Sequence, residues 1–200
     1  FRWSWYLEHQ QEWHQFITKW LDILQPEQCY SGFEVSSPLI MDGGPEHGVM
    51  ERMLADHFYG LDIDHPFTLS FHNNRQPDEW MNPARMGAGL RPATWGIMLS
   101  NYWLGRLGKT AQQVKQDLRH ICSCTLLSDG VWIETTPKPQ LYPVDEGVPE
   151  VLVKVNAYLK PILNDQLQLH VFDAWDDDPN PRFDESNSPQ WLRRFEVDSN

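Results

Sequence analysis

The feature that most constrains this fold is the dipeptide Asp129-Gly130, which lies between two apolar stretches at residues 121–127 and 131–135. Asp-Gly between two apolar runs is a strong short-range signal for a β-hairpin, because both residues tolerate the backbone conformations of a tight turn. Upstream, residues 95–101 form a brief apolar run that is rich in large side chains. Such a run predicts a buried strand. The middle of the chain is therefore expected to follow the order strand, helix, helix, hairpin.

Two amphipathic helices are predicted in the first sixty residues. Residues 7–24 carry apolar side chains at intervals of three and four, and Pro26 follows as a stop signal. Pro45 fits the first turn of a second helix, which we expect Gly60 to close. The residues on the apolar face of the first helix are Trp13, Phe16, Ile17, Trp20, Leu21 and Leu24.

Two further helices are predicted on either side of the hairpin. Thr110, with Gln113 three residues later, has the pattern of a capping box, which satisfies unpaired backbone donors at a helix start. After the hairpin, Asp145 or Glu146 is expected to cap a helix whose last turn Pro161 breaks. Both segments place apolar residues on one face, as core-facing helices do.

The remaining segments predict strands and one long loop. Residues 29–35, 67–71 and 167–172 have the alternation or composition of strands. Residues 72–92 hold several prolines, glycines and asparagines with little periodicity, which indicates a long exposed loop, and loops of that length are often functional. We therefore predict that residues 1–200 form a single α+β domain, with a mainly antiparallel β-sheet covered by amphipathic helices.

The charge of the chain restricts its partners. With 28 acidic and 16 basic residues, the formal net charge is −12. Such a protein repels nucleic acid and anionic membrane surfaces, so a basic partner suits it better. No apolar run approaches the roughly 18 residues that a membrane span requires. The three cysteines do not form an even disulfide framework, which favours a reducing, cytoplasmic setting.

The sequence offers no complete set of catalytic or metal-binding residues. His120, Cys122 and Cys124 alternate along one segment, and no second pair completes a tetrahedral zinc site. The three aspartates at 176–178 lack the alternating spacing and the glycine of a calcium-binding EF-hand loop. No glycine-rich phosphate loop and no serine-nucleophile elbow is present. We therefore expect a protein that is not an enzyme, with no catalytic residues, no metal and no cofactor.

Several segments together resemble a known bacterial family. They combine aromatic, glycine and proline positions in a fixed order along most of the chain, although none is a chemical signature. The segments are Tyr59-Gly-Leu-Asp62, Thr94-Trp-Gly-Ile-Met-Leu-Ser-Asn-Tyr-Trp103, Leu107-Gly108, Asp129-Gly-Val-Trp-Ile-Glu134, Pro139, Pro143 and Trp191-Leu-Arg-Arg-Phe195. This succession resembles the type VI secretion immunity proteins that neutralise VRR-Nuc nuclease toxins.

The resemblance implies a binding protein. An immunity protein of this family is expected to act in the cytoplasm, where it holds its cognate nuclease in an inactive complex. VRR-Nuc toxins belong to the PD-(D/E)xK nucleases, which must present a basic cleft to DNA phosphates. An acidic partner would be attracted to that cleft and could occlude the cleft or the active site.

Two segments that combine tryptophan with carboxylates are candidates for toxin binding. The first lies in the predicted loop, and the second opens an acidic C-terminal segment at residues 173–200. Trp175 and Trp191 have an alternative role in packing this tail onto the sheet, since tryptophan is usually largely buried. We expect Trp95, Trp103 and Trp132 to belong to the core. The candidate toxin-binding residues are Asp78, Glu79 and Trp80 in the first segment, and Asp173, Trp175, Asp176, Asp177 and Asp178 in the second.

Two alternative functions remain at this point. A metal-dependent hydrolase would use Asp62, Asp64 and His65, and it predicts bound metal and perturbed carboxylates in a pocket. A structural subunit of a secretion assembly would instead present a surface for strong self-association. The incomplete set of ligands and nucleophiles weakens the hydrolase hypothesis without separating the other two.

Overall fold

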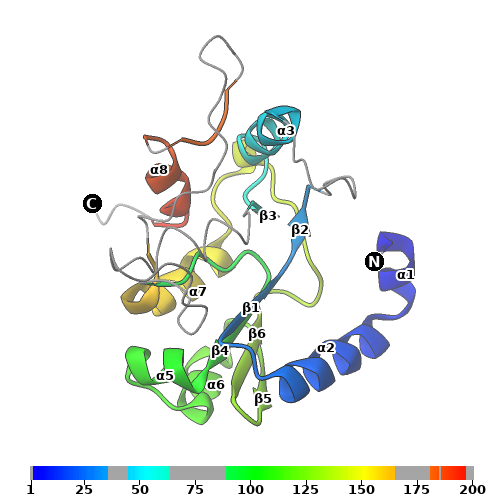
Figure 1. Cartoon of the computed structure of the whole chain (residues 1–200), viewed down its shortest axis with the longest axis vertical. Coiled ribbons are helices and arrows are strands. Elements are labelled where there is room, and N and C mark those ends of the chain that lie inside the picture. Colours follow the sequence, from blue (N-terminus) through cyan, green and yellow to red (C-terminus); the bar gives the residue numbers. More distant parts are fainter. Residues whose placement is uncertain (1, 36–44, 64–88, 165–180, 185, 197–200) are drawn as a thin grey trace, which may run out of the picture.

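The computed structural model (Figure 1) describes residues 2–35, 45–63, 89–164, 181–184 and 186–196. Four strands form an antiparallel sheet in the order β1-β4-β6-β5, and a two-stranded parallel sheet joins β2 to β3. The fold is thus α+β with a mainly antiparallel sheet, as predicted. The strands are β1 (Gln28–Ser31), β2 (Phe33–Glu34), β3 (Leu61–Asp62), β4 (Gly96–Ser100), β5 (Ser123–Leu127) and β6 (Gly130–Glu134).

Helices pack around this sheet and at one end of the molecule. Figure 1 shows α5, α6 and α7 on one side of the sheet and α2 on the other, with α3 and α8 at the far end. The α-helices are α1 (Trp3–Glu8), α2 (Gln10–Leu24), α3 (Pro45–Ala55), α5 (Asn101–Leu107), α6 (Ala111–Leu118), α7 (Glu150–Leu159) and α8 (Ser188–Leu192). The 3-10 helices are η1 (Val144–Glu146) and η2 (Lys160–Ile162).

The predicted hairpin is present as β5 and β6. Leu127 pairs with Gly130, so Ser128 and Asp129 form a two-residue connection. Gly130 has a φ of +142°, and a Cβ atom there would collide with the carbonyl of Leu99 on β4. Glycine is therefore required where the hairpin enters the sheet.

The central strand β4 is buried on both faces, and its alternation divides the core in two. Ile97 and Leu99 contribute to a cluster with α5, α6 and α7. Met98 points the other way, because successive side chains of a strand lie on opposite faces, and it packs with Trp132 and helices α1 and α2. A third cluster joins α3, β3 and α8. The tryptophans Trp95, Trp103 and Trp132 are all buried, which confirms their prediction as core residues.

Two of the predicted helix starts have different outcomes. The capping box is confirmed, because Thr110 Oγ1 accepts from the Gln113 backbone N–H and Gln113 Oε1 accepts from the Thr110 N–H. The predicted cap at Asp145 or Glu146 is wrong. These residues lie in η1, and α7 begins only at Glu150, after Pro149. The intervening Gly147 has a φ of +88°, which separates the two helical segments.

Some predicted boundaries also differ from the structure. The helix at residues 7–24 is divided at His9, whose φ of −129° interrupts the helical backbone between α1 and α2. The second helix ends at Ala55 and not at Gly60. The strand at 29–35 is split at Gly32 between two different sheets.

The predicted loop at residues 72–92 ends in buried structure. Leu90 forms a parallel bridge with Leu163 and is fully buried. The prediction of an exposed loop is therefore wrong for residues 89–92. The backbone N–H of Leu90 donates to the Ile162 carbonyl at 2.8 Å. Residues 72–88 and the predicted strands at 67–71 and 167–172 lie outside the described residues. None of the helices in the described part of the chain combines the length and apolarity that a membrane crossing requires.

Candidate partner-binding surface

Both predicted toxin-binding segments lie outside the described residues, including Trp80 in the first and Trp175 in the second. Trp191, by contrast, lies in α8 and is buried against Phe183, with the two ring centroids 5.6 Å apart. Both residues cluster with Ala55 and Leu61, so the end of the acidic C-terminal segment packs onto α3 and β3. Trp191 has a structural role, in line with the packing alternative considered for it.

Asp62, the described member of the proposed metal site, is engaged in an ion pair. Its Oδ1 lies 2.9 Å from Arg91 Nη1, and both side chains are largely buried. The Arg91 guanidinium also lies over the Tyr30 ring, 4.0 Å from its centroid. Asp64 and His65 are outside the described residues. Within the ranges that the structure describes, no three histidine, cysteine, aspartate or glutamate side chains converge on a possible metal position.

The second potential metal-binding group is also accounted for by packing. Cys122 and Cys124 pack against the central core, and a hydrogen bond between them, together with burial, raises the pKa of Cys122. His120 is exposed and accepts a hydrogen bond from its neighbour Arg119. The two cysteines are thus partly buried side chains packed against the core, and the histidine is exposed.

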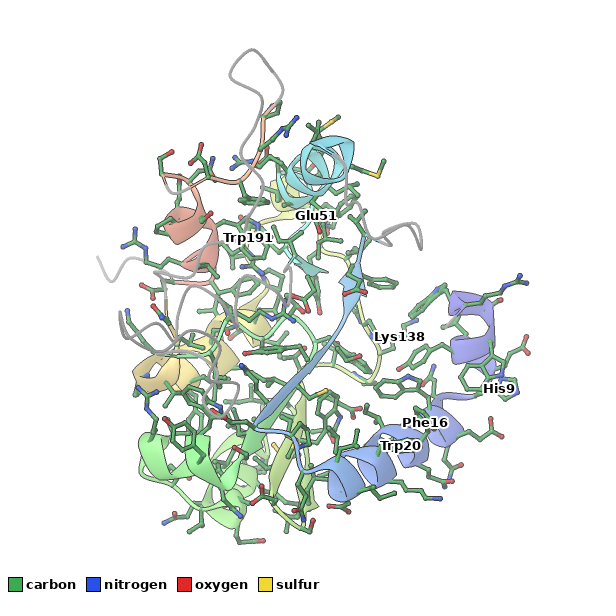
Figure 2. All side chains as sticks on the ribbon, in the orientation of Figure 1. His9, Phe16, Trp20, Glu51, Lys138 and Trp191 are labelled. Carbon is green, nitrogen blue, oxygen red and sulfur yellow. The ribbon has the colours of Figure 1, made fainter. Side chains whose placement is uncertain are left out.

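The largest feature that the sequence analysis missed is the exposed half of α2. Trp13 and Leu21 are buried beneath the helix, whereas four apolar residues beside them stay in solvent. Figure 2 shows Phe16 and Trp20 along α2, where their ring centroids lie 6.1 Å apart. We refer to these four residues as the α2 apolar face: Phe16, Trp20, Ile23 and Leu24, which are 47%, 42%, 58% and 66% exposed.

The spacing of these residues explains why one helix has both a buried and an exposed apolar stripe. Each residue of an α-helix advances by about 100°, so the apolar side chains of α2 cover a wider arc than a core-facing helix needs. The side of α2 that carries Trp13, Ile17 and Leu21 packs on the sheet. The remainder, around Phe16 and Trp20, is partly exposed, and Leu24, which projects on the packed side, is exposed because it is the last residue of α2. The unusual width of the stripe was visible in the sequence and could have indicated this surface.

Polar contacts fix the helix that carries this face. Asp22 Oδ1 accepts from the Ser128 backbone N–H in the β5–β6 turn at 2.7 Å. His14 Nδ1 lies 3.2 Å from Glu134 Oε1 on β6. Both contacts join α2 to the hairpin. The α2 apolar face is therefore presented on a helix with defined attachments, which reduces the conformational entropy that binding would cost.

Comparisons with known proteins give one family and one fold. A family described as "TsiV: Type VI immunity for VRR-NUC" matches residues 1–195. None of the curated proteins matches this sequence. The structure is similar to that of the Pseudomonas aeruginosa T6SS protein PA0821, with a TM-score of 0.75 and 21% identity. The similarity covers 98% of this chain and 51% of that protein, so the chain spans about half the length of this structural relative.

Proposed function

The chain belongs to the TsiV family, described as type VI immunity for VRR-NUC, and we propose that it binds and neutralises a cognate VRR-Nuc nuclease effector. The proposed action is stoichiometric, since an immunity protein holds its toxin and turns over no substrate. Residues 1–200 would act as one binding unit in the cytoplasm of the toxin-producing cell.

The observation that carries this proposal is the α2 apolar face. Isolated apolar residues on a protein surface are common and need no explanation. Phe16, Trp20 and Leu24, however, are three large exposed residues on one helix, and such a cluster is typical of an interaction site. Aromatic residues at the centre of an interface contribute much of the binding free energy. Trp20, beside Phe16 on α2, is the best candidate for such an anchor.

Charge favours a DNA-binding enzyme as the occupant. The net charge of −12 would accelerate encounter with a basic cleft, and an acidic protein seated there would exclude DNA. Residues 2–27, which include α2, are acidic on balance. They carry four carboxylates and two basic side chains: Glu8, Glu12, Asp22 and Glu27, and Arg2 and Lys19. Electrostatic attraction would orient the partner, and the apolar anchors would hold it.

The two acidic segments from the sequence analysis extend this proposal. Residues 78–80 and 173–178 combine Trp80 and Trp175 with carboxylates, so they would add further contacts to the basic cleft. Their contribution is separable from that of α2, because replacing Asp176, Asp177 and Asp178 by asparagine removes charge without touching the helix. That variant would show slower association and a weaker salt dependence if the tail faces the nuclease.

A plasmid-cleavage assay with the cognate VRR-Nuc nuclease tests the proposal. Wild-type protein is expected to abolish cleavage at a stoichiometric ratio. A variant with Phe16, Trp20 and Leu24 replaced by serine is expected to bind the nuclease at least about tenfold more weakly, because the anchors are lost. Serine substitutions at Met50 and Met53 on α3, which are exposed to a similar extent, provide the matched control.

Three outcomes would contradict parts of this proposal. Full cleavage at excess wild-type protein would reject neutralisation of this nuclease. Equal binding by the α2 and α3 variants would place the interface away from the α2 apolar face. Concentration-dependent self-association of the wild-type protein that the α2 variant abolishes would assign the face to a second copy of the chain.

A further inference from the structure

A cavity of about 210 Å³ opens between α1, α2 and the strand segment around β1 and β2. Helix α1 supplies part of the wall, and Pro139 also lines the cavity. No local sequence pattern indicates this cavity, because its walls come from four separate parts of the chain. We call it the aromatic cavity, after its five aromatic lining residues: Trp3, Tyr6, Trp13, Phe33 and Trp95.

The five rings form a continuous wall. Trp3 stacks on Tyr6 with ring centroids 5.2 Å apart and also contacts Phe33 at 4.9 Å. Trp95 contacts Tyr6 edge-on at 6.1 Å and Trp13 at 5.2 Å. Tyr6, Trp13 and Trp95 are buried, whereas Trp3 is 39% exposed. The cavity therefore has a fixed floor and one exposed tryptophan at its edge.

A carboxylate lies behind this floor. Glu134 on β6 is only 12% exposed, and its Oε1 accepts from Trp132 Nε1 at 3.0 Å, with His14 Nδ1 at 3.2 Å. Trp132 packs in the same cluster as the buried lining residues Tyr6, Trp13 and Trp95, which places the carboxylate close behind the floor. Burial, and secondly the Glu134 carboxylate, raise the pKa of Tyr6 to about 12. Both the carboxylate and the negative faces of the aromatic rings favour a positive charge in this space.

The size and shape of the aromatic cavity favour arginine among cationic occupants. A volume of about 210 Å³ admits a single side chain and excludes a helix or strand. The planar, weakly hydrated guanidinium stacks on aromatic faces, and its aliphatic stem packs against them. An ammonium group is more strongly hydrated and so costs more to place there. Nucleases that bind DNA phosphates must expose basic side chains of this kind.

We propose that the aromatic cavity receives an arginine side chain from the DNA-binding cleft of the nuclease partner and holds it by cation–π contact. This inference rests on the proposed function, and it adds the chemical identity of one interface contact. The arginine would lie against Trp3, with the charge of Glu134 behind the floor of the cavity. Removing that arginine from DNA contact would itself weaken the nuclease for its substrate.

Substitutions at Trp3 test the cation–π contact. The affinity for a catalytically inactive nuclease is expected to fall about threefold for Trp3→Phe and about tenfold for Trp3→Leu, because ring quadrupole strength decreases in that order. Trp5→Leu is the matched control, since Trp5 lies on the same helix, does not line the cavity and stacks instead on His9. Glu134→Gln keeps an acceptor for Trp132 and is expected to cost about threefold. Circular dichroism would verify that each variant is folded.

A second measurement separates this inference from the proposed function. N-acetyl-arginine amide and its neutral analogue N-acetyl-citrulline amide would be titrated into the protein alone, with the indole N–H signals of Trp3 and Trp13 as reporters. Arginine amide is expected to shift them in the millimolar range, and citrulline amide at least about fivefold more weakly.

The outcomes distinguish the two proposals. Wild-type affinity in Trp3→Leu, or equal shifts by arginine and citrulline amides, would overturn the arginine-binding role while leaving nuclease binding intact. Failure of the wild-type protein to bind the nuclease would overturn the proposed function. A response to arginine amide alone would then assign the cavity to another basic protein.

Discussion

Helices α7 and α2 have similar amphipathic patterns but opposite environments. Leu152, Val155 and Leu159 on α7 are fully buried against the sheet. On α2, Phe16 and Leu24 remain 47% and 66% exposed. The difference shows that periodicity reveals an apolar face without revealing what covers it. In α7 the face is covered by the fold, and in α2 half of it stays exposed.

Matched leucine substitutions on the two helices are expected to differ most in their effect on the free energy of unfolding. Leu159→Ala leaves a cavity in the central core and is expected to lower the free energy of unfolding by about 2–5 kcal/mol. Leu24→Ala removes exposed atoms and should change it by no more than about 0.5 kcal/mol. Chemical denaturation of both variants measures the difference. Equal losses would mean that Leu24 is covered in solution, which would contradict the comparison.

Hydrogen bonds provide a second contrast between the two helices. On α7, the buried Asn156 side chain accepts from Ala93 N–H at 2.8 Å and donates to the carbonyls of Ala93 and Leu152. Asn156→Ala leaves the N–H and the carbonyl of Ala93 unpaired in the core and is expected to cost about 2–3 kcal/mol.

The control for that variant lies on α2. Asp22→Ala removes an exposed hydrogen bond to Ser128, so its expected cost is about 1 kcal/mol or less. Thermal and denaturant unfolding of the two variants would be compared. A larger loss for Asp22→Ala would indicate that the attachment of α2 to the hairpin contributes more stability than the contact of α7 with the core.

The smallest effect concerns α1, where Tyr6 is buried beside Trp13. The pKa of Tyr6 is raised from 10.0 to about 12, first by burial and second by the Glu134 carboxylate. The folded state thus holds the phenol proton more tightly than the unfolded state, so this contribution to stability is present below pH 10 and is lost as the pH rises toward about 12. Tyr6→Phe should lose less stability across this window.

Unfolding free energies of wild type and Tyr6→Phe between pH 9 and about 12 would measure that effect. Tyr102→Phe, which removes an exposed phenol, is the control. An identical pH dependence in wild type and Tyr6→Phe would show that α1 is not docked on Trp13 and Trp95 in solution. The aromatic cavity would then lack one wall.

The parts of the fold that the sequence predicted are those set by near neighbours. The capping box of Thr110 and Gln113 joins residues three apart, and the hairpin signalled by Asp129-Gly130, whose turn is formed by Ser128 and Asp129, follows from local backbone preferences. The burial of Trp132 follows from its place in a dense apolar run. Local steric and hydrogen-bonding rules decide all three, so they are visible in any short window of sequence.

The predictions that failed depend on the conformation of a few linking residues. The break at His9 and the late start of α7 at Glu150 are both consistent with amphipathic periodicity, which continues across the interruption. Gly147, with a positive φ, directs the chain out of η1 before Pro149. Periodicity identifies the faces of a helix more reliably than its ends, because the same side chains form the apolar face whether the helix ends at the predicted residue or at the observed one.

The sequence by itself determined the α+β class, the acidic charge and the family resemblance. Only the tertiary structure decided that β1 pairs with β4, that Asp62 pairs with Arg91, and that rings from Trp3 and Trp95 share one cavity. These contacts join residues that are distant in the chain, and no local preference encodes which distant segments meet. The sequence also shows that the apolar stripe of α2 is wide, but only the tertiary structure decides which part of that stripe the sheet covers.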